Sequence, residues 1–124
     1  MNRRERRASV STIRHSNLLT HLVDANMPLD NHAVLHNAVL HWYSHIDARK
    51  PVCIGCKRSF LDPDVRVGCF LLSVPVGGPD IVATSAFCTE CHETLSLTQV
   101  DAISTRVLRQ LAPGGIFLDG GTAP

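Results

Sequence analysis

Two pairs of cysteines constrain this chain more than any other feature of its sequence. Cys53 and Cys56 form one C-x-x-C pair, and Cys88 and Cys91 form a second after an interval of thirty-one residues. A C-x-x-C spacing lets one backbone turn present two sulfurs to the same point, and two such pairs supply four thiolates for a tetrahedral metal. The spacing therefore predicts a structural Zn²⁺ site with Cys53, Cys56, Cys88 and Cys91 as its ligands.

The size and composition of the chain suit one small domain held together by such a site. It has 124 residues, of which 44% are hydrophobic, enough for a modest core that a metal would reinforce. The N-terminal stretch lacks the apolar run of about 7–15 residues of a secretory signal, and no segment reaches the roughly 18 apolar residues of a membrane span. We therefore expect a cytoplasmic protein with no membrane partner, whose thiols stay reduced and favour metal over disulfides.

Positive charge is concentrated at the N-terminus although the net charge is only +1. Residues 1–15 are predicted to be a disordered basic tail, which either stays solvated or contacts phosphates. A second group of basic residues surrounds the first cysteine pair, where it would offset the −2 charge of a zinc with four thiolates or bind nucleic acid. The candidate nucleic-acid-binding residues are Arg3, Arg4, Arg6, Arg7, Arg49, Lys50, Lys57 and Arg58.

The region before the first cysteine pair predicts helices over residues 17–47. Asn17 to Ala25 is expected to form a short helix that ends at Met27-Pro28. A longer helix is expected from Asp30 to about Asp47, with Asp30 or Asn31 as its N-cap. Its buried stripe consists of the apolar residues at helical spacing, Leu35, Val39, Trp42 and Ile46.

The longer predicted helix carries two histidine pairs at i, i+4 spacing, His32 with His36 and His41 with His45. The pairs face different directions, so they cannot form one site, and neither is followed by the glutamate of an H-E-x-x-H zinc protease. We expect edge and surface histidines, with a second metal site at either pair as the alternative.

A β-hairpin is predicted between the two cysteine pairs. Residues 65–74 and 81–87 are rich in β-forming residues and flank a Gly-Gly-Pro-Asp turn. Antiparallel strands would return Cys88 and Cys91 to the side of Cys53 and Cys56. A short helix is expected to begin at the second pair, and Ser96 with Gln99 forms a capping box that opens a helix over residues 97–111. Residues 116–118 are expected to fold back onto the core, and 119–124 to form a loose end.

Cys69, the histidine after the second pair and the C-x-x-C spacing itself raise further possibilities. Cys69 lies mid-strand without a partner at metal spacing, so we expect a small buried apolar residue rather than a reactive thiol. Cys88 to His92 matches the C-x-x-C-H pattern of haem attachment, but haem would leave Cys53 and Cys56 without a role. A thioredoxin-like redox role lacks the βαβ pattern. His92 remains a candidate donor to a thiolate or a substitute ligand.

At these residues the chain resembles the zinc-ribbon and treble-clef group of zinc modules. The resemblance covers residues 51–95 and implies an α+β fold in which a four-cysteine zinc site holds a β-hairpin, flanked by N-terminal and C-terminal helices. Residues 16–118 would form that single domain. The whole chain also looks like small, uncharacterised bacterial zinc-binding proteins, a likeness that implies no activity.

Three classes of function follow from these features. The first is a non-enzymatic regulatory or adaptor module that binds a protein partner, since four cysteines leave a zinc no open position for catalysis. The second is a nucleic-acid-binding module that uses the basic residues named above, although basic and aromatic residues are not interleaved. An enzyme is the third, and no phosphate loop, nucleophile elbow or zinc-protease motif points to catalytic residues. The sequence does not predict the oligomeric state.

Overall fold

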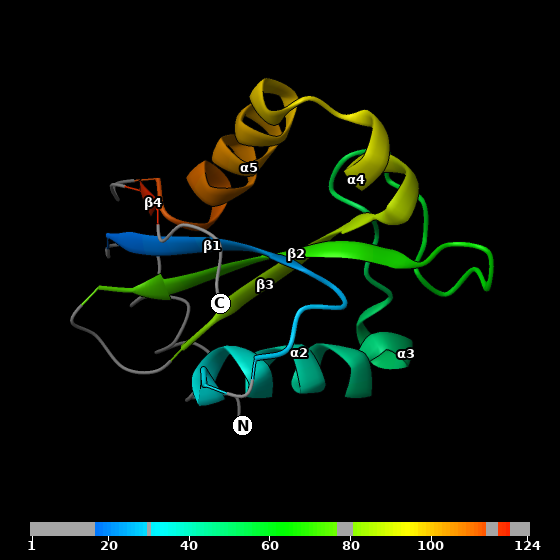
Figure 1. Ribbon diagram of the computed structural model, residues 1–124, viewed down its shortest axis with the longest axis horizontal. Helices are drawn as coiled ribbons and strands as arrows, with labels where there is room; N and C mark the ends of the chain where they lie inside the picture. Colours follow the sequence, from blue (N-terminus) through cyan, green and yellow to red (C-terminus); the bar gives the residue numbers. More distant parts are fainter. Residues whose placement is uncertain (1–16, 30, 77–80, 114–116, 120–124) are drawn as a thin grey trace.

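A four-stranded sheet forms the centre of the computed structural model, which describes residues 17–29, 31–76, 81–113 and 117–119 (Figure 1). The strand order is β3-β2-β1-β4; β2 is antiparallel to both β1 and β3, whereas β4 runs parallel to β1. The strands are β1 (Leu18–Asp24), β2 (Val67–Pro75), β3 (Ala83–Cys88) and β4 (Phe117–Asp119).

The part of the chain that the structure describes contains four helices, so the fold is α+β as expected. Helix α2 lies on one face of the sheet and α5 on the other, while α4 follows directly from β3 (Figure 1). The helices are α2 (Ala33–Ser44), α3 (Ile46–Arg49), α4 (Thr89–Thr94) and α5 (Leu97–Leu111). None of these described helices is long and apolar enough to cross a membrane.

The prediction of a helix over residues 17–25 was wrong, because most of this segment forms strand β1. All seven residues of β1 pair with β2, and Leu18 and Val23 are buried in the core. Since β1 lies between two strands and helices cover the sheet, its apolar residues need not alternate with polar ones, and such a run also fits a helical pattern. Pairing with β2, which is distant in sequence, determines that this segment is a strand and not a helix.

The remaining helix predictions agree with the structure apart from their ends. The helix predicted for 30–47 is present as α2 and α3, interrupted at His45. Its N-cap is His32, without a side-chain hydrogen bond, instead of Asn31; Asp30 lies outside the described residues. The helix predicted for 97–111 matches α5, whose capping box is confirmed: Gln99 N–H donates to Ser96 Oγ at 3.2 Å, and Ser96 N–H to Gln99 Oε1 at 2.8 Å.

The predicted hairpin is confirmed by strands β2 and β3, although its turn, residues 77–80, lies outside the described residues. A register shift between Val67 and Cys69 places Gly68 where α4 begins. A Cβ on Gly68 would lie 2.6 Å from His92 Cβ and 2.9 Å from Cys88 O, so only glycine allows this close approach. Because Gly68 has no side chain, the start of α4 can pack directly against β2.

The core on the α2 side of the sheet is aromatic. Trp42 makes edge-to-face contacts with Phe60 and Phe70, with ring centroids 5.3 Å apart in each pair. The partly buried Val39 and Ile46 of the same helix face also pack on the core, and Leu35 is buried. The stripe predicted for this helix therefore faces the sheet.

The C-terminal segment contributes a strand where the sequence predicted only a return to the core. Phe117–Asp119 pairs with the first residues of β1, and Ile116 lies outside the described residues. The predicted tail at residues 1–15 and the end at 120–124 also lie outside them, so their disorder stays a prediction.

Candidate metal centre

The first cysteine pair lies on a tight backbone turn, the knuckle, defined as residues 53–58. Cys53 N–H donates to Arg58 O, and Lys57 N–H donates to Cys53 O, each at 2.9 Å. Lys57 adopts a left-handed conformation, with φ of 68°, which closes the turn. Ile54 N–H donates to Ala86 O at 3.0 Å and so attaches the knuckle to strand β3.

The second cysteine pair lies where β3 passes into α4. Cys88 is both the last residue of β3 and the N-cap of α4, and its sulfur accepts a hydrogen bond from Cys91 N–H at 3.4 Å. Because Cys91 lies in the first turn of the helix, its side chain is on the same side as that of Cys88. The Cys88 sulfur thus accepts the N-cap hydrogen bond that a side-chain oxygen usually accepts.

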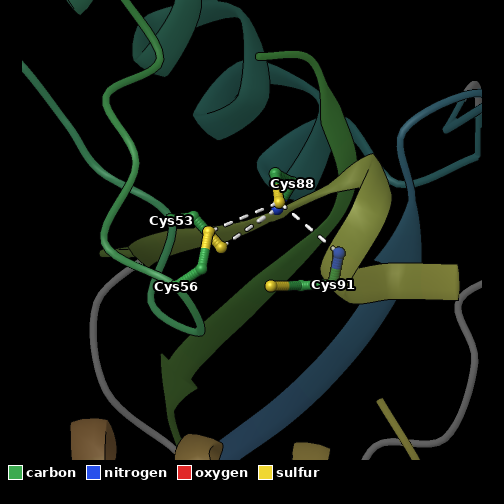
Figure 2. A group of neighbouring side chains, drawn as sticks. All are labelled: Cys53, Cys56, Cys88 and Cys91. Atoms are coloured by element: carbon green, nitrogen blue, oxygen red, sulfur yellow. Dashed lines mark hydrogen bonds between the residues drawn. The ribbon is translucent and has the colours of Figure 1, made fainter. Parts of the chain in front are cut away.

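These two turns bring the four predicted ligands together. The sulfurs of Cys53, Cys56, Cys88 and Cys91 all lie within 4.8 Å of one another, and Figure 2 shows them gathered between the knuckle and the start of α4. Cys56 Sγ and Cys88 Sγ are 3.7 Å apart. All four thiols are free of disulfides. The four-cysteine group can therefore hold a metal ion, as the sequence predicted.

The group is mostly enclosed by protein. Cys53, Cys88 and Cys91 are buried, whereas Cys56 is exposed. Cys53 Sγ accepts hydrogen bonds from Gly55 N–H at 3.3 Å and from Cys88 N–H at 3.2 Å (Figure 2 shows the second). Backbone N–H groups directed at sulfur stabilise negative charge on it, as a metal thiolate requires.

The protonation of the four thiols shows what a bound cation would supply. For Cys53, burial opposes ionisation, but hydrogen bonds from the backbone of Cys56, Cys88 and Gly55 outweigh it and lower the pKa to about 7. For Cys88 and Cys91, burial is the largest cause and raises the pKa. The neighbouring thiols raise the pKa of Cys91 further, whereas hydrogen bonds with Cys91 partly offset the rise for Cys88. One thiolate forms readily without a metal, but four adjacent thiolates require a cation between them.

An ion pair and a histidine–carboxylate contact flank the cysteines, and sequence reasoning missed both acidic partners. Arg58 contacts Glu90 at 3.0 Å, which joins the knuckle to α4 across the cysteine group. His92 Nε2 lies 2.6 Å from Asp24 Oδ1, so His92 is directed to β1 and not to a thiolate as we had considered. Glu90 follows a helix N-cap by two residues, a favourable place for an acid, whereas nothing local to Asp24 announces its partner.

Gly55 is a further residue of the centre, and sequence reasoning missed it. A Cβ there would lie 2.9 Å from Cys91 Sγ and 3.4 Å from Leu95 Cδ1. The glycine therefore allows the knuckle to approach the first turn of α4. Its place between the two cysteines of the first pair was the available signal.

The basic residues proposed for nucleic acid have different surroundings. Arg58 is paired with Glu90, Lys50 and Lys57 are exposed, and Arg49 lies at the end of α3 beside α2. The four arginines of the N-terminal tail, Arg3, Arg4, Arg6 and Arg7, lie outside the described residues.

The histidine pairs show no third ligand among the described residues that could complete a metal site. The rings of His41 and His45 are stacked with centroids 4.0 Å apart. Burial lowers the pKa of His41, and the charges of His45 and Arg49 add to this effect. His36, His41 and His45 are exposed, and His32 is partly buried at the helix end. These are the edge and surface positions that the sequence predicted.

Cys69 is a buried strand residue, as predicted, with 2% of its surface exposed. Burial, followed by the charge of Asp24, raises the pKa of its thiol to about 12. Such a thiol is protonated at neutral pH and is a poor nucleophile.

Comparison of this chain with protein-family models, with curated proteins and with solved structures finds no match.

Proposed function

We propose that this chain is a zinc-stabilised adaptor module of the treble-clef kind, without enzymatic activity, which acts by binding a protein partner. The convergence of four cysteine sulfurs from two backbone turns carries the proposal.

Zinc suits the donor set and its dimensions. Four Zn–S bonds of about 2.3 Å place neighbouring sulfurs about 3.8 Å apart in a tetrahedron. Cys56 Sγ and Cys88 Sγ are already 3.7 Å apart, and the widest separation in the group is within 4.8 Å. Thiolates also bind iron, which the metal analysis below distinguishes.

The order of elements supports the treble-clef kind of module. A cysteine knuckle comes first, the hairpin of β2 and β3 follows, and α4 supplies the last two ligands from its N-terminus. A zinc at this point would link the knuckle, the end of β3 and the start of α4. Ile54 N–H already joins the knuckle to β3 through Ala86 O, and Arg58 joins it to α4 through Glu90.

A structural role follows from the saturated ligand set. Catalytic zinc sites keep one position for water or substrate, whereas four cysteines occupy every position of a tetrahedral ion. Burial of Cys53, Cys88 and Cys91 also keeps water from most of the group. The metal would thus stabilise the fold, and function would depend on the partner that the folded surface binds.

A protein partner is favoured by exposed apolar side chains on α2 and just before the knuckle. Leu40, Tyr43 and Val52 are 53%, 46% and 41% exposed. Apolar residues at a surface contribute to protein contacts more than to phosphate contacts. Arg58, one of the cations proposed for phosphate, is engaged by Glu90.

The zinc proposal is tested by measuring the metal content of the wild type and of two variants. The two variants replace equally buried cysteines with the same residue. Cys88 and Cys69 are each 2% exposed, and each is replaced by alanine. Wild type and Cys69→Ala, purified under reducing conditions, should contain one zinc per chain by elemental analysis. Cys88→Ala should lose zinc and unfold at a lower urea concentration than wild type, because metal binding is coupled to folding. A folded wild type without zinc, or with iron, would overturn the assignment.

A salt titration with generic DNA separates the protein-binding proposal from nucleic-acid binding. The adaptor proposal expects no measurable affinity at low salt. Affinity that falls steeply as salt rises, and that Lys57→Ala or Arg58→Ala weakens, would replace the protein partner with nucleic acid.

A further inference from the structure

A groove lies between α2 and the residues that lead into β3, on the sheet face opposite α5. It encloses about 500 Å³. Its wall from α2 contains Val34, Ala38 and Trp42, and Val82 lines the side next to β3. Thr84 of β3 also lines it, and Figure 1 shows α2 running below β3. The part of the lining that Val34, Ala38, Trp42 and Val82 form is therefore apolar, with Asn37 as a polar residue beside it.

The groove runs beside a free strand edge. Among the described residues, β3 is the outermost strand of the sheet and pairs only with β2. Ala86 O faces away from β2, because it accepts from Ile54 N–H of the knuckle. Backbone groups alternate in direction along an antiparallel strand, so Thr84 N–H, Thr84 C=O and Ala86 N–H face the same way. Within the described residues no strand covers them.

The end of the groove next to α3 is positively charged. Arg49 lines it and makes no ion pair with another described residue. His41 is its neighbour in the lining, and the described residues that line the groove include no carboxylate. The groove thus passes from an apolar part to an unpaired cation, which is the charge pattern expected for an acidic group on a ligand.

From these three observations we infer that the β3 edge binds an extended peptide segment of a protein partner as an added strand. One aliphatic side chain of the peptide fills the groove between Ala38, Trp42 and Val82, and an acidic side chain two or four residues away contacts Arg49. Side chains at even spacing share a face of a strand, so both reach the groove while the backbone bonds to Thr84. This inference rests on the proposed function as an adaptor and specifies its binding surface.

The zinc centre determines how much of the β3 edge is available. The knuckle occupies the edge at Ala86, and Cys53 Sγ accepts from Cys88 N–H, so the C-terminal end of β3 is already covered. The free segment begins immediately before it. A peptide bound there would abut the knuckle, which sets the position of its last paired residue.

Selection from a random peptide library displayed on phage, against the zinc-loaded full chain, tests the inference. Selected sequences should share an aliphatic residue followed or preceded at a distance of two or four by Asp or Glu. A synthetic peptide of that sequence should bind Arg49→Glu at least about tenfold more weakly, the equivalent of one charge-assisted hydrogen bond. Arg106→Glu, an exposed arginine of α5 on the opposite face, is the matched control and should bind as wild type does.

The backbone contacts are tested without altering the protein. Methylation of alternate peptide amides removes the donors that strand addition requires, so the methylated peptide should lose binding. The unmethylated peptide should slow amide hydrogen exchange at Thr84 and Ala86. Failure to enrich any sequence, or binding unaffected by both Arg49→Glu and methylation, would overturn the inference.

Two other results can be told apart from peptide binding at the β3 edge. A concentration-dependent dimer in sedimentation that Thr84→Pro disperses would assign the edge to a second copy of this chain, against the peptide inference. Zinc is measured on the same samples: peptide binding by a folded chain without zinc overturns only the metal assignment, and zinc without peptide binding overturns only the groove.

Discussion

Substitution of Gly68 by alanine tests whether the close approach of β2 to α4 positions the metal ligands. The added Cβ would lie 2.6 Å from His92 Cβ and 2.9 Å from both Cys88 O and Thr89 Cα. Carbon atoms pack favourably at about 3.5–4.0 Å, so the start of α4 must move by on the order of 1 Å. Two of the three obstructing atoms belong to the backbone, which a rotamer change cannot relieve.

The expected loss of stability is near the upper end of the range for overpacking, about 3 kcal/mol. The same movement displaces Cys88 and Cys91, whereas metal–ligand distances tolerate only about 0.2 Å. Zinc affinity should therefore fall by about tenfold or more, as it does when residues supporting metal ligands are altered. Stability and metal affinity should decline together.

Urea unfolding of the zinc-loaded protein and chelator competition for zinc measure these two effects. Ala102→Gly, at an exposed position of α5, is the control: it should reduce stability by about 1 kcal/mol through helix propensity alone and leave zinc affinity unchanged. If Gly68→Ala unfolds within 0.5 kcal/mol of wild type, a margin typical of surface substitutions, and binds zinc as tightly, the packing argument is refuted.

Three further predictions concern the other cysteines and glycine. Gly55→Ala should weaken zinc binding by about tenfold in chelator competition, because its Cβ would lie 2.9 Å from Cys91 Sγ; unchanged affinity would show that the knuckle can yield. In mass spectrometry after alkylation at pH 8, chelation should expose four cysteines while Cys69, with its pKa raised to about 12, reacts only after unfolding. The folded pKa of Cys69 lies above its ordinary value of 9.0, so its contribution to stability is complete below pH 9 and is lost as pH rises from 9 toward 12. Wild type should therefore lose about 1 kcal/mol more than Cys69→Ala between pH 9 and 10, and parallel pH profiles of the two would contradict this.

Sequence reasoning succeeded where the deciding interactions are local. Each C-x-x-C pair places its sulfurs through one turn, and the capping box of Ser96 and Gln99 involves only the first turn of α5. The hairpin was predictable because its strands are consecutive in sequence. The four-cysteine group followed from these parts, since a hairpin returns the chain to its starting point.

The errors arise where partners are distant in sequence. β1 is a strand because β2 pairs with it, and the apolar run Leu18–Val23 is compatible with a helix until that partner is known. The direction of His92 depends on Asp24, which β1 places beside α4. The parallel pairing of β4 with β1 likewise joins the two ends of the described chain. No periodicity within a segment encodes such contacts.

The bond between Ile54 N–H and Ala86 O also bears on what happens when the metal is lost. The knuckle covers the last part of the outermost strand, and the cysteines hold the knuckle in place. Without a cation the knuckle would be free to detach, and the strand from Ala83 to Cys88, including the buried Phe87, would present a longer open edge. Open edges of apolar hairpins pair with one another and aggregate. Loss of the metal would then lower the concentration of monomeric protein through aggregation. Samples treated with a chelator should precipitate before they unfold fully.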